Sequence, residues 1–211
     1  GTVPFEVFGL TTADDPQEDY RAMWPCGWVW PHQYREQMTK DILKFGRDRG
    51  MRFYYPLMFG EVPTPFKDRH PERKYVPHGY NHPMLYPDDP LCYEMTKKYY
   101  KRVIETFGTD HLYFDAPYGE SSSADTPDES LKLKTAAALK ACQIFKEIDP
   151  QSVWMTDSWD FSAVPQVWTA ERIKKYYASL PKEMMYVYDT CADWSPWYNR
   201  TNFFEGTKWT F

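Results

Sequence analysis

The chain has 211 residues, which suits one domain with a substantial core. Hydrophobic residues make up 42% of it, so the chain is not disordered, and no apolar run approaches the roughly 18–20 residues that a membrane-spanning helix needs. The formal charge is −5 and the basic residues are scattered, so we expect neither a nucleic-acid partner nor a membrane partner.

The predicted elements alternate between strand and helix along the chain. Hydrophobic periodicity and capping signals predict strands at 5–10, 51–57, 111–115, 152–156, 183–188 and 208–211, and helices at 31–49, 91–107, 127–148 and 168–179. The apolar stripe of the first helix is Tyr34, Met38, Ile42 and Phe45. Thr126 and Glu129 form a predicted capping box, with Pro127 at the first helical position.

This alternation predicts an α/β fold with a parallel sheet. Two architectures fit, a doubly wound sheet and a (β/α)8 TIM-type barrel. The long loops follow the carboxyl ends of the strands, where barrel enzymes build their sites, and this favours the barrel. With about six strands where a barrel needs eight, we expect residues 1–211 to be an incomplete part of one (β/α) barrel catalytic domain.

Aromatic residues are abundant, with 9 Trp, 17 Tyr and 13 Phe making up 18% of the chain. Many occur in irregular, Pro-rich stretches rather than in the predicted elements. The apolar faces of sugar rings stack on such side chains, whereas packing of long loops is the simpler explanation for any one of them. A loop surface rich in aromatic and acidic residues therefore favours a carbohydrate ligand.

Acidic residues follow several predicted strands. Glu61 follows the strand at 51–57. Asp115 ends the next strand and Glu120 follows it, Asp157 and Asp160 follow the strand after that, and Asp189 and Asp193 follow the strand at 183–188. In a barrel these strand ends meet at one mouth, and glycoside hydrolysis needs two carboxyl groups there. Any single Asp is also a candidate for a helix cap or a turn. Glu120 precedes no helix that would need it, so it is the best catalytic candidate.

Other chemistries have weaker support. His78 and His82 could begin a metal site of a metal-dependent barrel hydrolase, but Pro77, Gly79 and Pro83 break the helix that would align them, so we expect no metal and no cofactor. No GxSxG elbow, P-loop, dinucleotide fingerprint or CxxC pair occurs in the sequence.

The run Glu105–Tyr113, followed by Glu120, resembles glycoside hydrolase family 89, the α-N-acetylglucosaminidases. In that family a helix ends in an FGTDH-type run, a strand follows, and the catalytic acid/base Glu lies a few residues beyond. Weaker similarity extends from about residue 24 to residue 211. One departure is Gly119, where the family usually has Asn.

The resemblance implies a retaining, exo-acting glycosidase for terminal α-linked N-acetylglucosamine, with Glu120 as acid/base. Trp24 and Trp159 would stack on the sugar, Asp157 and Asp193 would bind hydroxyls or hold loops, and Tyr118 would contact substrate. The family's nucleophile lies beyond the position that matches Phe211, so the remaining parts of the barrel are expected partners. A non-catalytic carbohydrate-binding barrel fragment is the main alternative. We expect a secreted, periplasmic or lysosomal location rather than a cytoplasmic one.

Overall fold

The computed structural model describes residues 32–56, 59–79, 82–114 and 117–211, and side chains only from Glu36 onward. The strand expected at 5–10 and the candidate residue Trp24 lie outside the described residues. The chain divides into two compact units. One takes in the residues up to Phe53 together with Lys98–Asp110, and the other consists of Tyr54–Lys97 and His111–Phe211.

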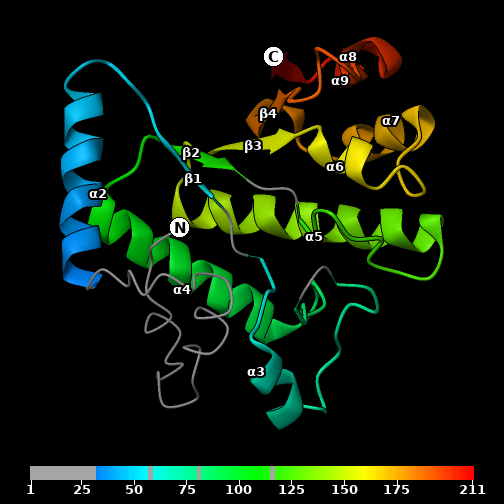
Figure 1. Cartoon of the computed structure of the whole chain (residues 1–211), viewed down its shortest axis with the longest axis horizontal. Coiled ribbons are helices and arrows are strands. Elements are labelled where there is room, and N and C mark those ends of the chain that lie inside the picture. The colour runs from blue at the N-terminus through cyan, green and yellow to red at the C-terminus, as the bar shows by residue number, and fades with distance from the viewer. Residues whose placement is uncertain (1–31, 57–58, 80–81, 115–116) are drawn as a thin grey trace. The chain divides into compact units, whose positions relative to one another are not determined.

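The second unit is built on a five-stranded sheet in which every neighbouring pair is parallel. Its strands are β1 (Tyr54–Pro56), β2 (Leu112–Phe114), β3 (Val153–Asp157), β4 (Met185–Tyr188) and β5 (Lys208–Thr210). Each lies within or next to a strand predicted from the sequence. The strands follow one another in space in the same order as in the chain, as Figure 1 shows for β1 to β4.

Sequential strand order decides between the two predicted architectures. A doubly wound sheet reverses its strand order at a switch point, whereas a barrel adds each strand beside the previous one. Here β1 to β5 are added without a reversal, so the doubly wound alternative is wrong and the fold is that of part of a (β/α) barrel.

Helices fill the connections between the strands. Their bounds are α3 (Thr64–Arg69), α4 (Pro90–Phe107), α5 (Pro127–Ile148), α6 (Trp159–Ala163), α7 (Ala170–Ala178), α8 (Trp197–Arg200) and α9 (Asn202–Glu205), with a 3₁₀ turn at Lys182–Met184. The short helices α3, α6, α8 and α9 were not predicted, because segments of four to six residues give little periodicity. Helix α7 begins two residues later than predicted because Thr169 caps it, accepting the amide N–H of Arg172.

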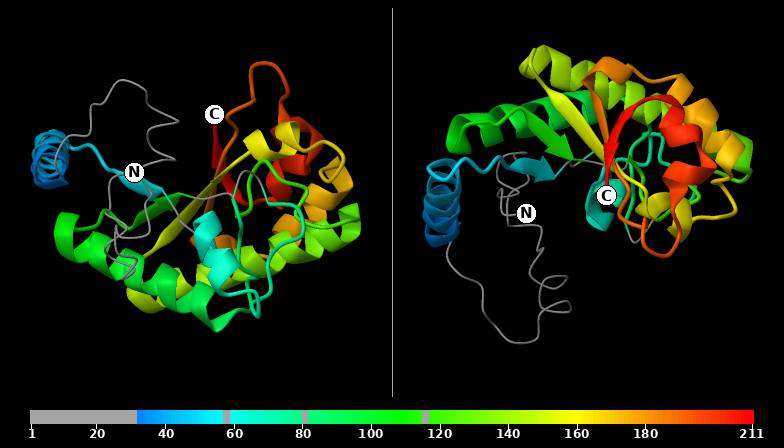
Figure 2. Two further views of the ribbon diagram at one scale, coloured as in Figure 1. Left: turned by 60° about the horizontal axis from the view of Figure 1, so that its bottom comes forward. Right: turned by 90° about the horizontal axis from the view of Figure 1, so that it is seen from above.

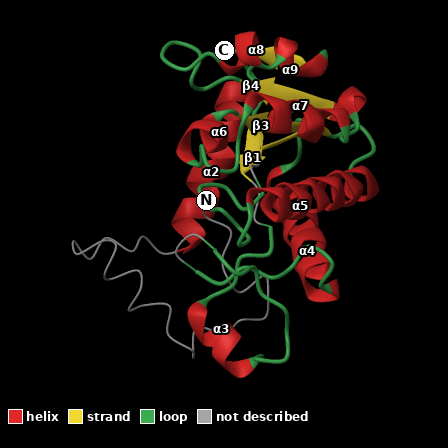
Figure 3. Ribbon diagram, turned by 90° about the vertical axis from the view of Figure 1, so that its right-hand side faces the viewer, coloured by secondary structure: helices red, strands yellow, loops and turns green. Residues whose placement is uncertain are grey.

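The two faces of the sheet differ. Tyr113 of β2 stacks on Phe145 of α5, with ring centroids 4.6 Å apart. Its neighbours in register, Trp154 of β3 and Met185 of β4, are fully buried on the same face. Helices α5 and α7 contact each other, and both lie along this side of the sheet (Figures 2 and 3).

The opposite face carries Tyr54, Leu112, Phe114, Val153, Met155 and Tyr186, which alternate with the buried residues and are only partly buried or exposed. In a complete barrel such residues fill the interior. Their apolar character therefore agrees with the incomplete barrel expected from the sequence.

Helix α5 confirms its predicted start and packing. Thr126 accepts the amide N–H of Glu129 through its side chain, and its hydroxyl donates to the Glu129 carboxylate at 2.8 Å. The helical period of the sequence predicts that Ala138, Cys142, Phe145 and Ile148 face inward. The first three are buried, and Ile148, at the end of the helix, is only half-buried. Burial raises the pKa of the Cys142 thiol to about 12, so this cysteine is an inert core residue.

In the first unit, α2 (His32–Arg47) exists as predicted, but the predicted inward stripe is wrong. Met38, Ile42 and Phe45 are more than half exposed, and the buried positions are Leu43 and Gly46. The reason is Gly46, whose missing side chain leaves room for the ring of Phe53 to approach the helix. Tyr34 lies among the residues whose side chains are not described. Over the described ranges, no helix is both long enough and apolar enough to cross a membrane.

Candidate active site

The loop after β2 has an unusual backbone. Tyr118, Glu120 and Ser123 all have positive φ angles, at 55°, 56° and 68°. Non-glycine residues rarely adopt this conformation, and it persists only where the surroundings enforce it, often at functional sites. Two contacts hold this loop in its conformation. The Ser121 hydroxyl donates to the carbonyl of Tyr118 at 2.8 Å, and Ser123 forms a β-bridge with His78.

A buried ion pair between α5 and α6 holds this loop in place. The ammonium of Lys134 on α5 lies 3.0 Å from the carboxylate of Asp160 on α6, and also donates to the carbonyl of Tyr118 at 2.6 Å. Asp160 accepts two further hydrogen bonds, one from the Trp168 indole at 2.6 Å and one from the amide N–H of Glu120 at 2.8 Å. Asp160 therefore has a structural role, because its carboxylate links α5, α6 and the loop through hydrogen bonds.

The side chain of Glu120 is exposed at the carboxyl end of the sheet, and the Trp159 indole N–H donates to it at 2.6 Å. Trp159 starts α6, directly beyond β3, and remains 46% exposed. The exposed indole of Trp159 offers an apolar face, and the carboxylate of Glu120 beside it offers a group that can transfer a proton. The structure thus brings together two residues that the sequence placed in the site, 39 positions apart.

Asp157 is the last residue of β3 and shares this edge of the sheet. Burial raises the pKa of Asp157 to about 6, and the negative charges of Asp160 and Glu120 act in the same direction. A hydrogen bond from the amide of Trp159 opposes them. The site therefore holds a carboxyl group that changes its protonation state in mildly acidic solution.

The ends of β3 and β4 are joined by a second buried carboxylate, Asp189. It accepts hydrogen bonds from the hydroxyl of Ser158 and from the amide N–H of Tyr198. Asp193, a few residues later, is exposed and makes none of the hydrogen bonds or ion pairs found in the described part of the chain. The structure thus places Asp193 in the loop after β4 without joining it to Glu120.

The remaining candidates behave differently. Tyr118 is only 3% exposed, and its hydroxyl donates to the carbonyl of Leu85 at 2.7 Å, so its observed contacts support the loop. Asp115, like Trp24, lies outside the described residues.

The two histidines of the alternative metal site have separate partners. His78 lies 2.7 Å from Asp125, and His82 lies 3.5 Å from Glu61. The nearby carboxylate of Glu61 raises the pKa of His82. Among the described residues, no group of three or more potential ligands that could hold a metal ion is found.

The FGTDH-type run serves the fold rather than the chemistry. In the first unit, Asp110 accepts hydrogen bonds from the Arg47 guanidinium and the Phe53 amide, all at 3.0 Å. In the second unit, His111 lies 2.8 Å from buried Asp149, which also accepts from the Tyr113 hydroxyl. Within the second unit, His111 therefore anchors the start of β2, and β2 in turn leads to the Glu120 loop.

Sequence reasoning missed Lys134 and Trp168. A signal for Lys134 was present, since it occupies the same face of its helix as Ala137, Ala138 and Ala141, all of which are buried. A lone lysine on an apolar helix face must find a buried partner. Nothing in the sequence indicated that this partner would be Asp160.

A sequential parallel sheet whose carboxyl edge carries carboxyl groups and an exposed tryptophan is the arrangement of a (β/α)-barrel domain with a candidate site at the usual end of the barrel. The family model for the α-N-acetylglucosaminidase (NAGLU) TIM-barrel domain matches residues 20–211. The chain belongs to this family.

Individual relatives agree with this assignment. Human α-N-acetylglucosaminidase is 28% identical over 123 residues, which is 58% of this chain and 16% of that protein. A family 89 glycoside hydrolase from Clostridium perfringens, in complex with 2-acetamido-1,2-dideoxynojirmycin, superposes with a TM-score of 0.60 at 19% identity, covering 81% of this chain and 20% of that one. The same organism's enzyme with its substrate GlcNAc-α-1,4-galactose gives a TM-score of 0.55 at 19% identity over 81% of this chain and 19% of that one. The chain thus spans about a fifth or less of these relatives.

Proposed function

We propose that this chain supplies the acid/base half of a retaining, exo-acting α-N-acetylglucosaminidase, and that Glu120 is the acid/base. We further propose that all 211 residues belong to one barrel domain. The observation that carries the proposal is the backbone conformation of Glu120 together with the position of its carboxylate. Its backbone is held in the left-handed region by buried Asp160, while its carboxylate projects to the carboxyl edge of the sheet beside Trp159.

The proposed reaction uses Glu120 twice. As a carboxylic acid it gives its proton to the glycosidic oxygen, so that the leaving sugar departs as a neutral alcohol. As a carboxylate it then takes a proton from the water that releases the bound sugar. A retaining mechanism also needs a second carboxylate as nucleophile, and we propose that the complete protein supplies it. The small share of the relatives that this chain spans supports this proposal.

The other site residues have proposed roles in binding a terminal α-linked N-acetylglucosamine. Trp159 provides the ring face against which the sugar packs, with Trp24 as a second such surface. Asp157 and Asp193 bind hydroxyl groups. Tyr118 is assigned to substrate binding through the position of its loop, because its own hydroxyl is engaged by Leu85.

The test is Glu120→Gln in the complete natural protein. General acid catalysis contributes roughly 10²–10⁴-fold, so hydrolysis of a natural α-N-acetylglucosaminide should fall by about that factor. An activated aryl glycoside needs little protonation, so formation of its glycosyl-enzyme should suffer much less. Added azide should then restore turnover, because it attacks without losing a proton.

The matched control is Glu183→Gln, an exposed glutamate at the amino end of β4, on the opposite edge of the sheet. This variant should retain activity on both substrates. Equal slowing of good and poor leaving groups by Glu120→Gln would contradict the acid/base assignment, and the role would pass to Asp157 or Asp193. A wild-type protein that binds the sugar but hydrolyses neither substrate would favour the non-catalytic alternative.

A further inference from the structure

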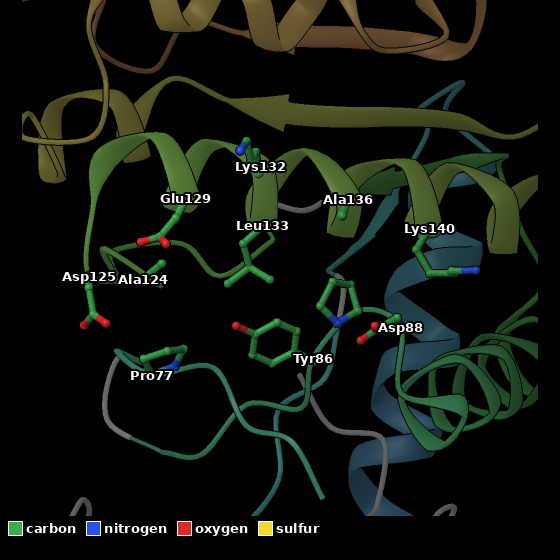
Figure 4. Close-up of a pocket in the computed structure, with 11 residues that line it drawn as sticks. Pro77, Tyr86, Asp88, Ala124, Asp125, Glu129, Lys132, Leu133, Ala136 and Lys140 are labelled. Atoms are coloured by element: carbon green, nitrogen blue, oxygen red, sulfur yellow. The ribbon is translucent and has the colours of Figure 1, made fainter.

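A cavity of about 450 Å³ lies outside the candidate active site, between Pro77 and Tyr86–Asp88 on one side and one face of α5 on the other (Figure 4). Glu129, Leu133, Ala136 and Lys140 line it with the spacing of a single helix face. Sites for small ligands have volumes of roughly 300–1,000 Å³ and combine apolar walls with a few polar groups. The size of the cavity is thus sufficient for a small ligand.

The walls of the cavity are mostly apolar, and one hydroxyl projects into it. Pro77 and Leu133 face each other across the cavity, and Ala136 continues the helix wall. The Tyr86 hydroxyl points into this space and makes no hydrogen bond within the part of the chain that the structure describes. The ammonium of Lys74 lies 3.8 Å from the centroid of the Tyr86 ring and so holds the ring in place.

Carboxylates mark the two ends of the cavity. Asp125 and Glu129 lie at one end and Asp88 at the other. Asp125 pairs with His78 and Glu129 accepts the Thr126 hydroxyl, but a carboxylate has about four acceptor positions, so both retain acceptor capacity. The cavity therefore offers hydrogen-bond acceptors and an apolar wall.

A pyranose unit matches this combination, since it presents hydroxyl donors around an apolar ring face. The position of the cavity supports the same ligand. Asp125 follows Glu120 by five positions in one loop, and five residues span at most about 17 Å. A glycan bound at Glu120 therefore has its further sugar units within reach of the cavity.

We propose that this cavity is a second carbohydrate-binding site, which holds a sugar unit of a glycan whose terminal residue lies at Glu120. The proposal rests on the proposed function for the identity of the glycan. The cavity itself lies on the outer side of α5 and shares no lining residue with the candidate active site.

The experiment blocks the cavity in the complete natural protein. Ala136→Trp places an indole in it from an exposed helix position, so the core is undisturbed. Leu139→Trp is the matched control, because Leu139 is also exposed on α5 but does not line the cavity. KM and kcat are measured on a small aryl α-N-acetylglucosaminide and on a long glycan with the same terminal sugar.

We expect Ala136→Trp to raise KM for the long glycan by about tenfold, equivalent to about 1.4 kcal/mol of binding free energy, and to leave the small substrate within twofold. Leu139→Trp should change neither. Tyr86→Phe, which removes only the hydroxyl, should raise KM for the long glycan by a smaller factor in the same direction. Equal kinetics of Ala136→Trp and wild type on the long glycan would overturn the proposal.

A second readout does not depend on turnover. In gels containing the same glycan, retardation of the protein should survive Glu120→Gln and be clearly weaker in the double variant Glu120→Gln/Ala136→Trp. Should the wild type hydrolyse nothing, this assay still tests the cavity, so failure of the two proposals can be told apart. Binding that disappears in about 0.3 M salt would instead indicate a charged ligand, paired either with Asp88, Asp125 and Glu129 or with Lys132 and Lys140, and would also overturn the carbohydrate assignment.

Discussion

The buried pair Lys134–Asp160 gives the sharpest prediction about how this fold holds its site. The two side chains are 1% and 6% exposed. Lys134→Met keeps the aliphatic stem but removes the charge, and leaves Asp160 with the Trp168 and Glu120 donors only. Breaking a buried pair from one side costs about 3–5 kcal/mol because the other charge is left uncompensated. Because two hydrogen-bond donors to Asp160 remain, we expect the unfolding free energy to fall by about 3 kcal/mol, the lower end of this range.

The double variant tests whether Lys134 and Asp160 depend on each other. Asp160→Asn alone should cost a similar amount, since it leaves the Lys134 ammonium buried without its carboxylate. Lys134→Met/Asp160→Asn removes both charges, so its cost should fall roughly 0.5–3 kcal/mol short of the sum of the two single costs. In a barrel domain of this size, about 3 kcal/mol corresponds to a fall in melting temperature of roughly 6–12 °C.

The assay is thermal unfolding of the four proteins, followed by circular dichroism, with activity measured in parallel. Each single variant should also lower kcat, because the Glu120 amide depends on Asp160 and the Tyr118 carbonyl depends on Lys134. Strictly additive costs, or a single-variant loss below 1 kcal/mol, would refute the view that this pair is a buried and mutually dependent unit.

Two further predictions concern stability. Because burial raises the pKa of Asp157 from an ordinary 3.8 to about 6, the folded state binds the proton more tightly, and stability should fall as pH rises from about 4 to 6. One pKa unit corresponds to about 1.4 kcal/mol, so the wild type should lose at most about 3 kcal/mol of unfolding free energy over this pH range, and Asp157→Asn should not show this loss. Melting curves from pH 4 to 7.5 test this. The exposed control Asp193→Asn should follow the wild type. Gly46→Ala would put a Cβ 2.3 Å from the Phe53 ring, so it should destabilise by roughly 1–3 kcal/mol despite better helix propensity. Phe53→Leu in the same chain should restore part of the melting temperature, and a rise in the Gly46→Ala single variant would contradict the packing argument.

Much of the fold was predictable because the signals are local. The capping box at Thr126 and the inward residues of α5 follow from a 3.6-residue period and side-chain capping. The candidate site was predictable in part for a related reason. In a parallel sheet, residues that follow different strands reach the same edge, so Glu120, Asp157 and Trp159 could be grouped before any coordinates.

Other features could not be read from the chain. The stripe of α2 was assigned to Met38, Ile42 and Phe45, but the helix turns Gly46 inward because Phe53, a residue outside the helix, occupies the space. Periodicity reports which face of a helix is apolar and contains no information about the shape of its neighbour.

The sequence by itself determined the alternation of strands and helices, the edge at which the carboxylates gather, and the identity of Glu120 as the leading acid/base candidate. Tertiary structure alone decided the sequential strand order, the pairing of Lys134 with Asp160, and the contact between Trp159 and Glu120. The physical reason is distance along the chain. Periods, caps and strand ends arise from interactions within a few residues, whereas these pairings join residues 26 and 39 positions apart, and their partners are fixed only when the whole sheet has assembled.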